Sequence, residues 1–206
     1  MAINLTKGQT INLGKDEHDL STLSIGLGWK IKKKGLLSFL GQGGEYDLDA
    51  VAFLLNETGK VANVGNERLQ GGDVIFFNNL KHPSGTVWHS GDNRVGGEGS
   101  QDDEQIVLEL NRIPPQYHRV LFLVSIYKGI EKKQHFGEVE SAFIRASDAK
   151  GKEIARYNLD KDPSYVGQCT MLFGEVYRKD QGWKFRALGE AHQTDAFVRI
   201  LKNYLP

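Results

Sequence analysis

The residues of this chain that could do chemistry are concentrated in a glycine-rich, acidic segment at positions 90–109, SGDNRVGGEGSQDDEQIVLE. Its side chains with hard oxygen donors are Asp92, Asn93, Glu98, Asp102, Asp103 and Glu104. The glycines among them let the backbone fold tightly. Two like charges a few ångströms apart repel by about 1 kcal/mol in water and by more near a protein surface. A compact arrangement of these carboxylates therefore requires a neutralising cation, and the segment predicts a cation-binding loop.

The donor types indicate which cation this loop would hold. The segment contains no cysteine, and the imidazole nearest to it in the chain is His89. Zinc and similar metals favour sulfur and nitrogen ligands, whereas calcium accepts six to eight oxygens in a flexible geometry. We therefore predict Ca²⁺ as the cofactor. The alternative, a solvated acidic turn that binds no ion, stays open on the residues alone.

A second pair of carboxylates stands at the start of the apolar run YDLDAVAFLLN, residues 46–56. The two-residue period of a β-strand places Asp47 and Asp49 on the same face as Phe53. The opposite face is apolar as well, so we expect this strand to be covered on both sides. Asp47 and Asp49 would then project together from its beginning and could share one ligand.

Further oxygen donors lie at the ends of two other predicted strands. Asn78 and Asn79 follow the run DVIFF and add neutral amide oxygens. In the strand that leaves the acidic loop, two-residue alternation predicts that Glu104 and Asp102 lie on the same face as Ile106. We expect these acidic strand ends to meet at one edge of the core, around one or two ions.

The elements that position these donors are predicted to be mostly short strands. Strand-like runs separated by turn residues recur from residues 3–5 onward, which favours an all-β fold. We expect a β-sandwich of two sheets with Gly/Asp-rich end loops. Residues 195–204 have apolar side chains at helical spacing, so they predict a C-terminal helix packed on the sandwich, with Asp195 near its positive end.

We predict a single domain over residues 1–206, with signs of an internal repeat. The segment FGEVESAFIRASDAKGK parallels GEYDLDAVAFLLNETGK, and it places Glu138 and Glu140 at the positions of Asp47 and Asp49. The two halves would be about residues 1–112 and 113–206.

Composition excludes some classes of function. Lys and Arg total 26, as do Asp and Glu, so no net positive charge favours nucleic acid as a partner. Cys169 is the only cysteine, so the chain cannot form an internal disulfide, and we expect a small buried thiol. The chain begins without a signal-peptide pattern, which predicts a cytoplasmic location. Trp29, Trp88 and Trp183 are expected in the core.

Several motifs in a fixed order carry a resemblance to a known family. They are INLTKGQTINL, YDLDAVAFLL, DVIFFNN, GDNRVGGEGSQDDEQIVLEL and FGEVESAFIR. Together they resemble the TerD family of bacterial tellurium-resistance and stress proteins, with its TerZ, TerE and TerX branches, over nearly the whole chain. The resemblance implies a cytoplasmic β-sandwich that binds calcium, usually two ions, through its acidic loops and acts with other stress-response and tellurium-resistance proteins. The positions matched to the family motif are Asp47, Asp49, Asn78, Asn79, Asp92, Asn93, Asp102, Asp103 and Glu104.

Three functions fit these features. The first is a calcium-ordered binding or adaptor module without enzymatic activity. The second is a calcium-dependent attachment module at a membrane surface, peripheral to its inner face, assisted by the basic run KIKKK at residues 30–34, which holds Lys30, Lys32, Lys33 and Lys34. The third is a metal-dependent hydrolase in which His82 or His89 acts as acid or base, although no nucleophile–base pair is evident in the sequence.

Overall fold

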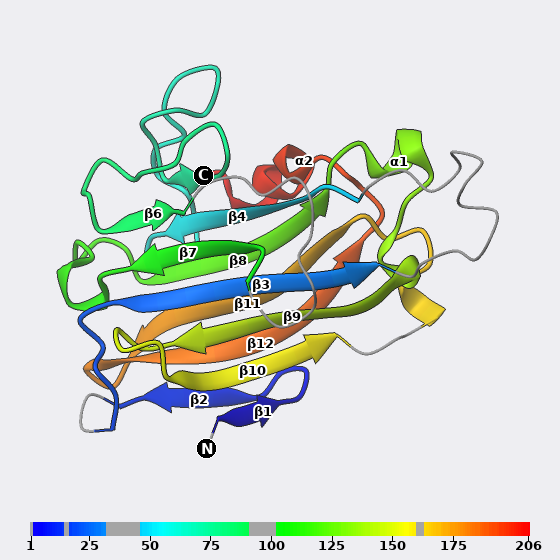
Figure 1. Ribbon diagram of the computed structural model, residues 1–206. Coiled ribbons are helices and arrows are strands. Elements are labelled where there is room, and N and C mark those ends of the chain that lie inside the picture. The colour runs from blue at the N-terminus through cyan, green and yellow to red at the C-terminus, as the bar shows by residue number, and fades with distance from the viewer. Residues whose placement is uncertain (1, 15–16, 32–45, 91–101, 160–162) are drawn as a thin grey trace.

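Two sheets stacked face to face form the molecule, shown as a computed structural model in Figure 1. The structure describes residues 2–14, 17–31, 46–90, 102–159 and 163–206. In these residues sheet A has six strands in the spatial order β1 (Ile3–Leu5), β10 (Glu153–Leu159), β9 (Val139–Ser147), β3 (Leu23–Ile31), β7 (Glu104–Leu108) and β6 (Val87–His89). Sheet B likewise has six described strands, in the order β2 (Thr10–Leu13), β12 (Gly182–His192), β11 (Thr170–Lys179), β8 (Arg119–Ile126), β4 (Leu48–Leu55) and β5 (Val74–Ile75).

Helices are few and short in the described part of the chain. The α-helices are α1 (Gly129–Lys132) and α2 (Phe197–Leu201), and 3₁₀ turns lie at Leu110–Arg112, Phe136–Glu138, Pro163–Tyr165 and Lys202–Tyr204. The predicted all-β sandwich with a C-terminal helix is confirmed. No described helix combines the length and the apolar character needed to cross a membrane.

The main core lies between the sheets and follows from strand alternation. In β3, β7 and β9 the buried apolar side chains of this core stand at alternate positions, as with Leu23 and Ile25, Ile106 and Leu108, and Ala142 and Ile144. β4 is buried on both faces, as its two-sided apolar pattern predicts. Its Ala50 and Leu54 join the core between the sheets, whereas Phe53 joins a second apolar cluster on the outer face of sheet B.

The C-terminal helix covers this second cluster. The ring of Phe53 in β4 lies 6.4 Å from the ring of Phe197 and 5.8 Å from that of Tyr204. The helical segment begins at Phe197, two residues after the predicted start, and ends in a 3₁₀ turn. Asp195 does not cap it. Its carboxylate instead accepts the backbone N–H of Ile130 at the start of α1 (3.1 Å).

Two local expectations differ from the structure. The strand predicted at residues 73–77 is reduced to Val74–Ile75, because Phe76 and Asn79 bond to each other's backbone and turn the chain. Trp88 is only half-buried, unlike Trp29 and Trp183, because it lies on the outer face of the edge strand β6. Cys169 is buried as expected, and burial, with the Asp195 charge nearby, raises the pKa of its thiol.

Strands from both halves of the sequence mix in each sheet. β1 pairs with β10 in parallel, and β2 pairs with β12. The two segments that look alike in sequence lie in different sheets, as β4 in sheet B and β9 in sheet A. The internal repeat and the single-domain assignment stay predictions.

Candidate functional site

Asp103 stands where the chain enters β7, and it is tied to the neighbouring strand β3. Its N–H donates to the carbonyl of Leu27 (2.7 Å), and its Oδ2 accepts the N–H of Trp29 (2.9 Å). The carboxylate is largely buried. The backbone pairing between β3 and β7 ends at Leu27 and Glu104. Beyond that end, the N–H of Trp29 in β3 has the Asp103 carboxylate as its acceptor in place of a strand carbonyl.

Glu104, the first residue of β7, connects the two sheets. Its side chain is only 1% exposed, and its Oε2 accepts the N–H of Ala50 in β4. β5 pairs with β4 only at Ala52 and Phe53, so Ala50 lies beyond the end of that ladder and takes a side-chain acceptor instead. The Oε2 of Glu104 also lies 3.5 Å from Nε2 of His89, at the end of β6. A buried carboxylate therefore joins the edges of sheets A and B.

Asp47 and Asp49 lie next to this junction. Both are half-buried, and the backbone carbonyl of Asp47 accepts the N–H of Tyr127 (2.7 Å). Asp49 immediately precedes Ala50, whose N–H binds Glu104. Ala50 faces the core between the sheets, so alternation places Asp49 on the opposite face of β4, as the sequence predicts. The start of β4 therefore lies beside the start of β7, but Asp49 points to the face of β4 opposite the one that Glu104 contacts.

Asp102 lies apart from Glu104, on the outer face of sheet A. Its Oδ1 accepts from Nε of Arg145 (2.7 Å) and its Oδ2 from the amide of Gln105 (2.8 Å). The carboxylate covers Gly26 so closely that any side chain there would overlap it. The expected shared face with Glu104 is wrong, because β7 begins only at Glu104 and strand alternation does not extend back to Asp102. The bond to Asp102 raises the pKa of Arg145.

Asn78 and Asn79 use their amides to hold the loop around β5. The Oδ1 of Asn78 accepts from Nε2 of Gln70 (3.2 Å), and that of Asn79 accepts the N–H of Gly71 (3.2 Å). Asn79 also donates to the carbonyl of Val74 (2.7 Å). These bonds give both residues a structural role in the described part of the chain.

The described residues do not by themselves form a cation site. Among them, no three His, Cys, Asp or Glu side chains are grouped closely enough to hold a metal ion. The predicted ligands Asp92, Asn93 and Glu98 lie outside the described residues. The donors that remain at the junction are carboxylates, two of them largely buried, on Asp103 and Glu104. A hard, oxygen-seeking cation such as calcium fits this donor chemistry.

A second polar cluster, around Asp73, was missed in the sequence. The Oδ1 of Asp73 accepts from the Tyr117 hydroxyl (2.7 Å) and lies 3.2 Å from Nε2 of His82. Nδ1 of His82 lies 2.7 Å from the hydroxyl of Ser84, which in turn lies 2.7 Å from that of Thr86. This order of groups is that of a Ser–His–Asp relay, yet the Ser84 oxygen is already bonded to Thr86. The motif His-Pro-Ser-Gly before β6 was the signal that could have revealed it.

The fold defines a class: a β-sandwich of two sheets joined at one edge by the bond from the N–H of Ala50 to Glu104. The family model described as "TerD domain" matches residues 1–204 of this chain. The chain therefore belongs to the TerD domain family, as the sequence motifs indicate.

Relatives with this domain carry names from tellurium resistance and stress response. The tellurium resistance protein TerX of Serratia marcescens is 48% identical over 214 residues, which cover all of both chains. The stress response protein SCP2 of Bacillus subtilis is 38% identical over the full length of both. A crystal structure of a homologue of telluride resistance protein (TerD) from Streptomyces coelicolor superposes with a TM-score of 0.63 at 19% identity, over 90% of this chain and 99% of that one. The last likeness shows the shared fold.

Proposed function

We propose that this chain acts in tellurium resistance or a related stress response as a calcium-binding module without enzymatic activity. Bound calcium would order the edge where β4, β6 and β7 meet and so form a surface for partner proteins of the same response. The names of its full-length relatives support the biological setting. The carboxylates at the junction of the sheets support the choice of ligand.

The observation that carries the proposal is the burial of two adjacent carboxylates, Asp103 and Glu104, at the junction. Removing an ionised carboxylate from water costs several kcal/mol unless charge or hydrogen bonds compensate. Backbone N–H groups of Trp29 and Ala50, with His89 beside Glu104, stabilise these carboxylates in the apo protein. Asp47 and Asp49 add negative charge at the start of β4, which a divalent cation would neutralise.

Calcium suits this donor set better than magnesium does. Magnesium requires near-ideal octahedral geometry and retains several waters, whereas calcium accepts irregular sets of carboxylate and carbonyl oxygens. Asp103 and Glu104 would bind one ion from sheet A, and Asp47 and Asp49, on the face of β4 opposite Glu104, would bind a second. Asp92, Asn93 and Glu98 of the predicted loop would complete the ligands. Calcium would supply charge neutralisation and a fixed link between the two strand starts.

Calorimetric titration of chelator-stripped protein with calcium tests this function. We expect saturable binding of about two ions with a micromolar or lower Kd, and weaker binding of magnesium. Asp103→Asn and Glu104→Gln should each weaken the binding at least tenfold, because each removes a carboxylate from the junction. Asp180→Asn is the matched control: Asp180 is exposed in the turn between β11 and β12, so calcium binding should be unchanged. If calcium produces no heat and no thermal stabilisation, the proposal is wrong.

A further inference from the structure

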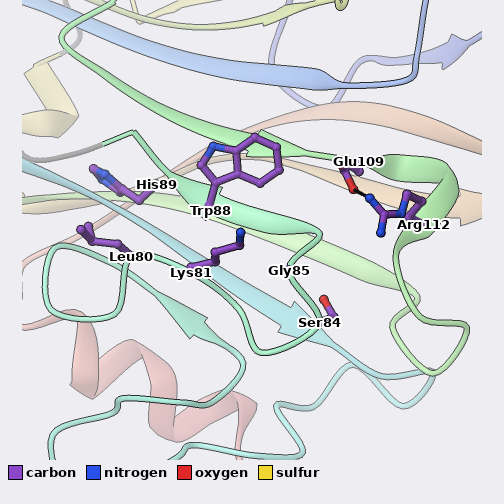
Figure 2. A pocket seen from close by; sticks show the side chains of 8 residues that line it. All are labelled: Leu80, Lys81, Ser84, Gly85, Trp88, His89, Glu109 and Arg112. Atoms are coloured by element: carbon purple, nitrogen blue, oxygen red, sulfur yellow. Dashed lines mark hydrogen bonds and ion pairs between the residues drawn. The ribbon is translucent and has the colours of Figure 1, made fainter.

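A pocket of about 510 Å³ opens on the edge of sheet A beside β6, a volume in the usual range for small-molecule sites. The side chains that matter here are Lys81, Ser84, Trp88, His89, Glu109 and Arg112. Figure 2 shows Trp88 and Lys81 extending from adjacent segments, Glu109 and Arg112 on another side, and Ser84 at the turn. Of the metal ligands predicted from the sequence, those that lie in the described residues do not line this pocket.

Two cations face the pocket, and one of them has no acidic partner among the described residues. Arg112 is paired with Glu109 at 2.7 Å and remains mostly exposed. Lys81 forms no ion pair with any acidic group in the described residues. Its side chain passes close to Gly85, with Cε 3.7 Å from where a Cβ would stand, and the φ of +74° at Gly85 favours glycine at this turn. The Lys, Arg and Glu side chains among the described lining residues, Lys81, Arg112 and Glu109, therefore sum to one positive charge.

Trp88 gives the pocket a flat apolar wall. It is half-buried, whereas Trp29 and Trp183 are inside the core. Trp88 and Lys81 are opposite each other in an antiparallel bridge, which places their side chains on the same side of the strands. An aromatic surface beside a lysine suits a ligand that has both a planar apolar part and a negative group.

The walls of the pocket are already held in place. The hairpin that carries Lys81 and Trp88 is closed by bonds from His82 N–H to the Val87 carbonyl (2.9 Å) and from His89 N–H to the Leu80 carbonyl (2.8 Å). At its turn the His82 ring is fixed between Asp73 and Ser84. A pre-formed site loses little ordering entropy when a ligand binds.

We propose that this pocket binds a small aromatic anion, with its carboxylate or phosphate group at Lys81 and its ring against Trp88. The site is separate from the proposed calcium function, although His89 lines the pocket and also lies beside Glu104. The proposal does not depend on calcium, and it is tested with chelator present so that the two can fail independently.

The test is ligand-observed NMR, together with tryptophan fluorescence, using benzoate and phenyl phosphate as probes and benzyl alcohol as the uncharged comparison. We expect saturable binding of an anionic probe and at least tenfold weaker binding of benzyl alcohol. Whichever of benzoate and phenyl phosphate binds more tightly identifies the preferred anion. Lys81→Gln should raise the Kd at least tenfold, and Trp88→Phe should weaken binding and remove the fluorescence response.

Lys7→Gln serves as the matched control, since Lys7 is an exposed lysine outside this pocket. It should leave the Kd unchanged. Lys81 is also exposed, so its substitution should not unfold the protein, and circular dichroism checks this. The proposal is overturned if neither anion binds saturably, if Lys81→Gln and Trp88→Phe bind as the parent does, or if Lys7→Gln loses as much affinity as Lys81→Gln.

Discussion

At the scale of single residues, the buried carboxylate of Asp73 binds several groups from the segments beside β5. It is 1% exposed and accepts bonds from the Tyr117 hydroxyl, from His82 and from the N–H of Asn63. Burial alone would raise the pKa of Asp73, but the bonds from His82, Tyr117 and Asn63 outweigh it, and the net pKa is lowered. Asp73 therefore stabilises the folded state as a carboxylate.

We expect Asp73→Asn to lower the free energy of unfolding at pH 7 by about 2–4 kcal/mol, because buried donors lose a charged acceptor. A carboxyl group with a lowered folded pKa contributes stability above its unfolded pKa of about 3.9, and this contribution is lost as pH falls through the folded value. The difference between the parent and Asp73→Asn should therefore shrink below about pH 4. Urea unfolding at pH 7 and pH 3 measures it. An equal difference at both pH values contradicts this account.

Single residues also show where sequence reasoning succeeds and fails. The faces of Asp49 and Glu104 were predictable because both lie inside strands, where alternation applies. The face of Asp102 was not predictable, because Asp102 precedes β7. Its side chain is oriented by a bond from Arg145, a residue 43 positions further along the chain. The Asp73 cluster was missed because His82, Ser84 and Thr86 look like ordinary turn residues until the fold brings Asp73 and Tyr117 to them.

At the scale of elements, α2 illustrates how packing decides how much a side chain contributes to the stability of the fold. Ile200 is 5% exposed and belongs to the apolar cluster on sheet B, whereas Val198 on the same helix is 45% exposed. The sequence periodicity predicted this helix and its packing, and the helix starts at Phe197, two residues after the predicted start.

We expect Ile200→Ala to destabilise the protein by about 2–4 kcal/mol through lost burial and a residual cavity. Val198→Ala is the matched control, and it should change stability by less than about 1 kcal/mol because the side chain is largely in water. Chemical unfolding measures the two effects, which can be compared directly when both variants have the same m-value. Equal losses in the two variants would show that α2 does not cover sheet B as the structure indicates.

At the scale of the whole molecule, the two sheets depend on each other. Each contains strands from both ends of the chain, and Glu104 of sheet A bonds to the backbone of Ala50 in sheet B. The sandwich class was predictable from the strand patterns and family motifs. The contact between Glu104 and Ala50 was not, because it depends on where the β5–β4 ladder ends, and that boundary is set by the turn between Phe76 and Asn79.

This link predicts that calcium, if it binds at Glu104, stabilises the entire sandwich. A ligand at about 100 times its Kd adds about 2.7 kcal/mol to the free energy of unfolding. For a chain of 206 residues, each kcal/mol raises Tm by about 2–4 °C, so the shift should be about 5–10 °C. Differential scanning calorimetry with calcium or with chelator measures it.

The shift should be a displacement of one cooperative transition, because the junction binds both sheets. Glu104→Gln is expected to lose most of the calcium-induced shift, whatever its own Tm, since the comparison is made within each variant. Asp180→Asn, with its exposed side chain in a distant turn, should keep the full shift. A calcium effect confined to a small early transition would mean that the ion orders only a local loop, and that Glu104 does not transmit its binding from one sheet to the other.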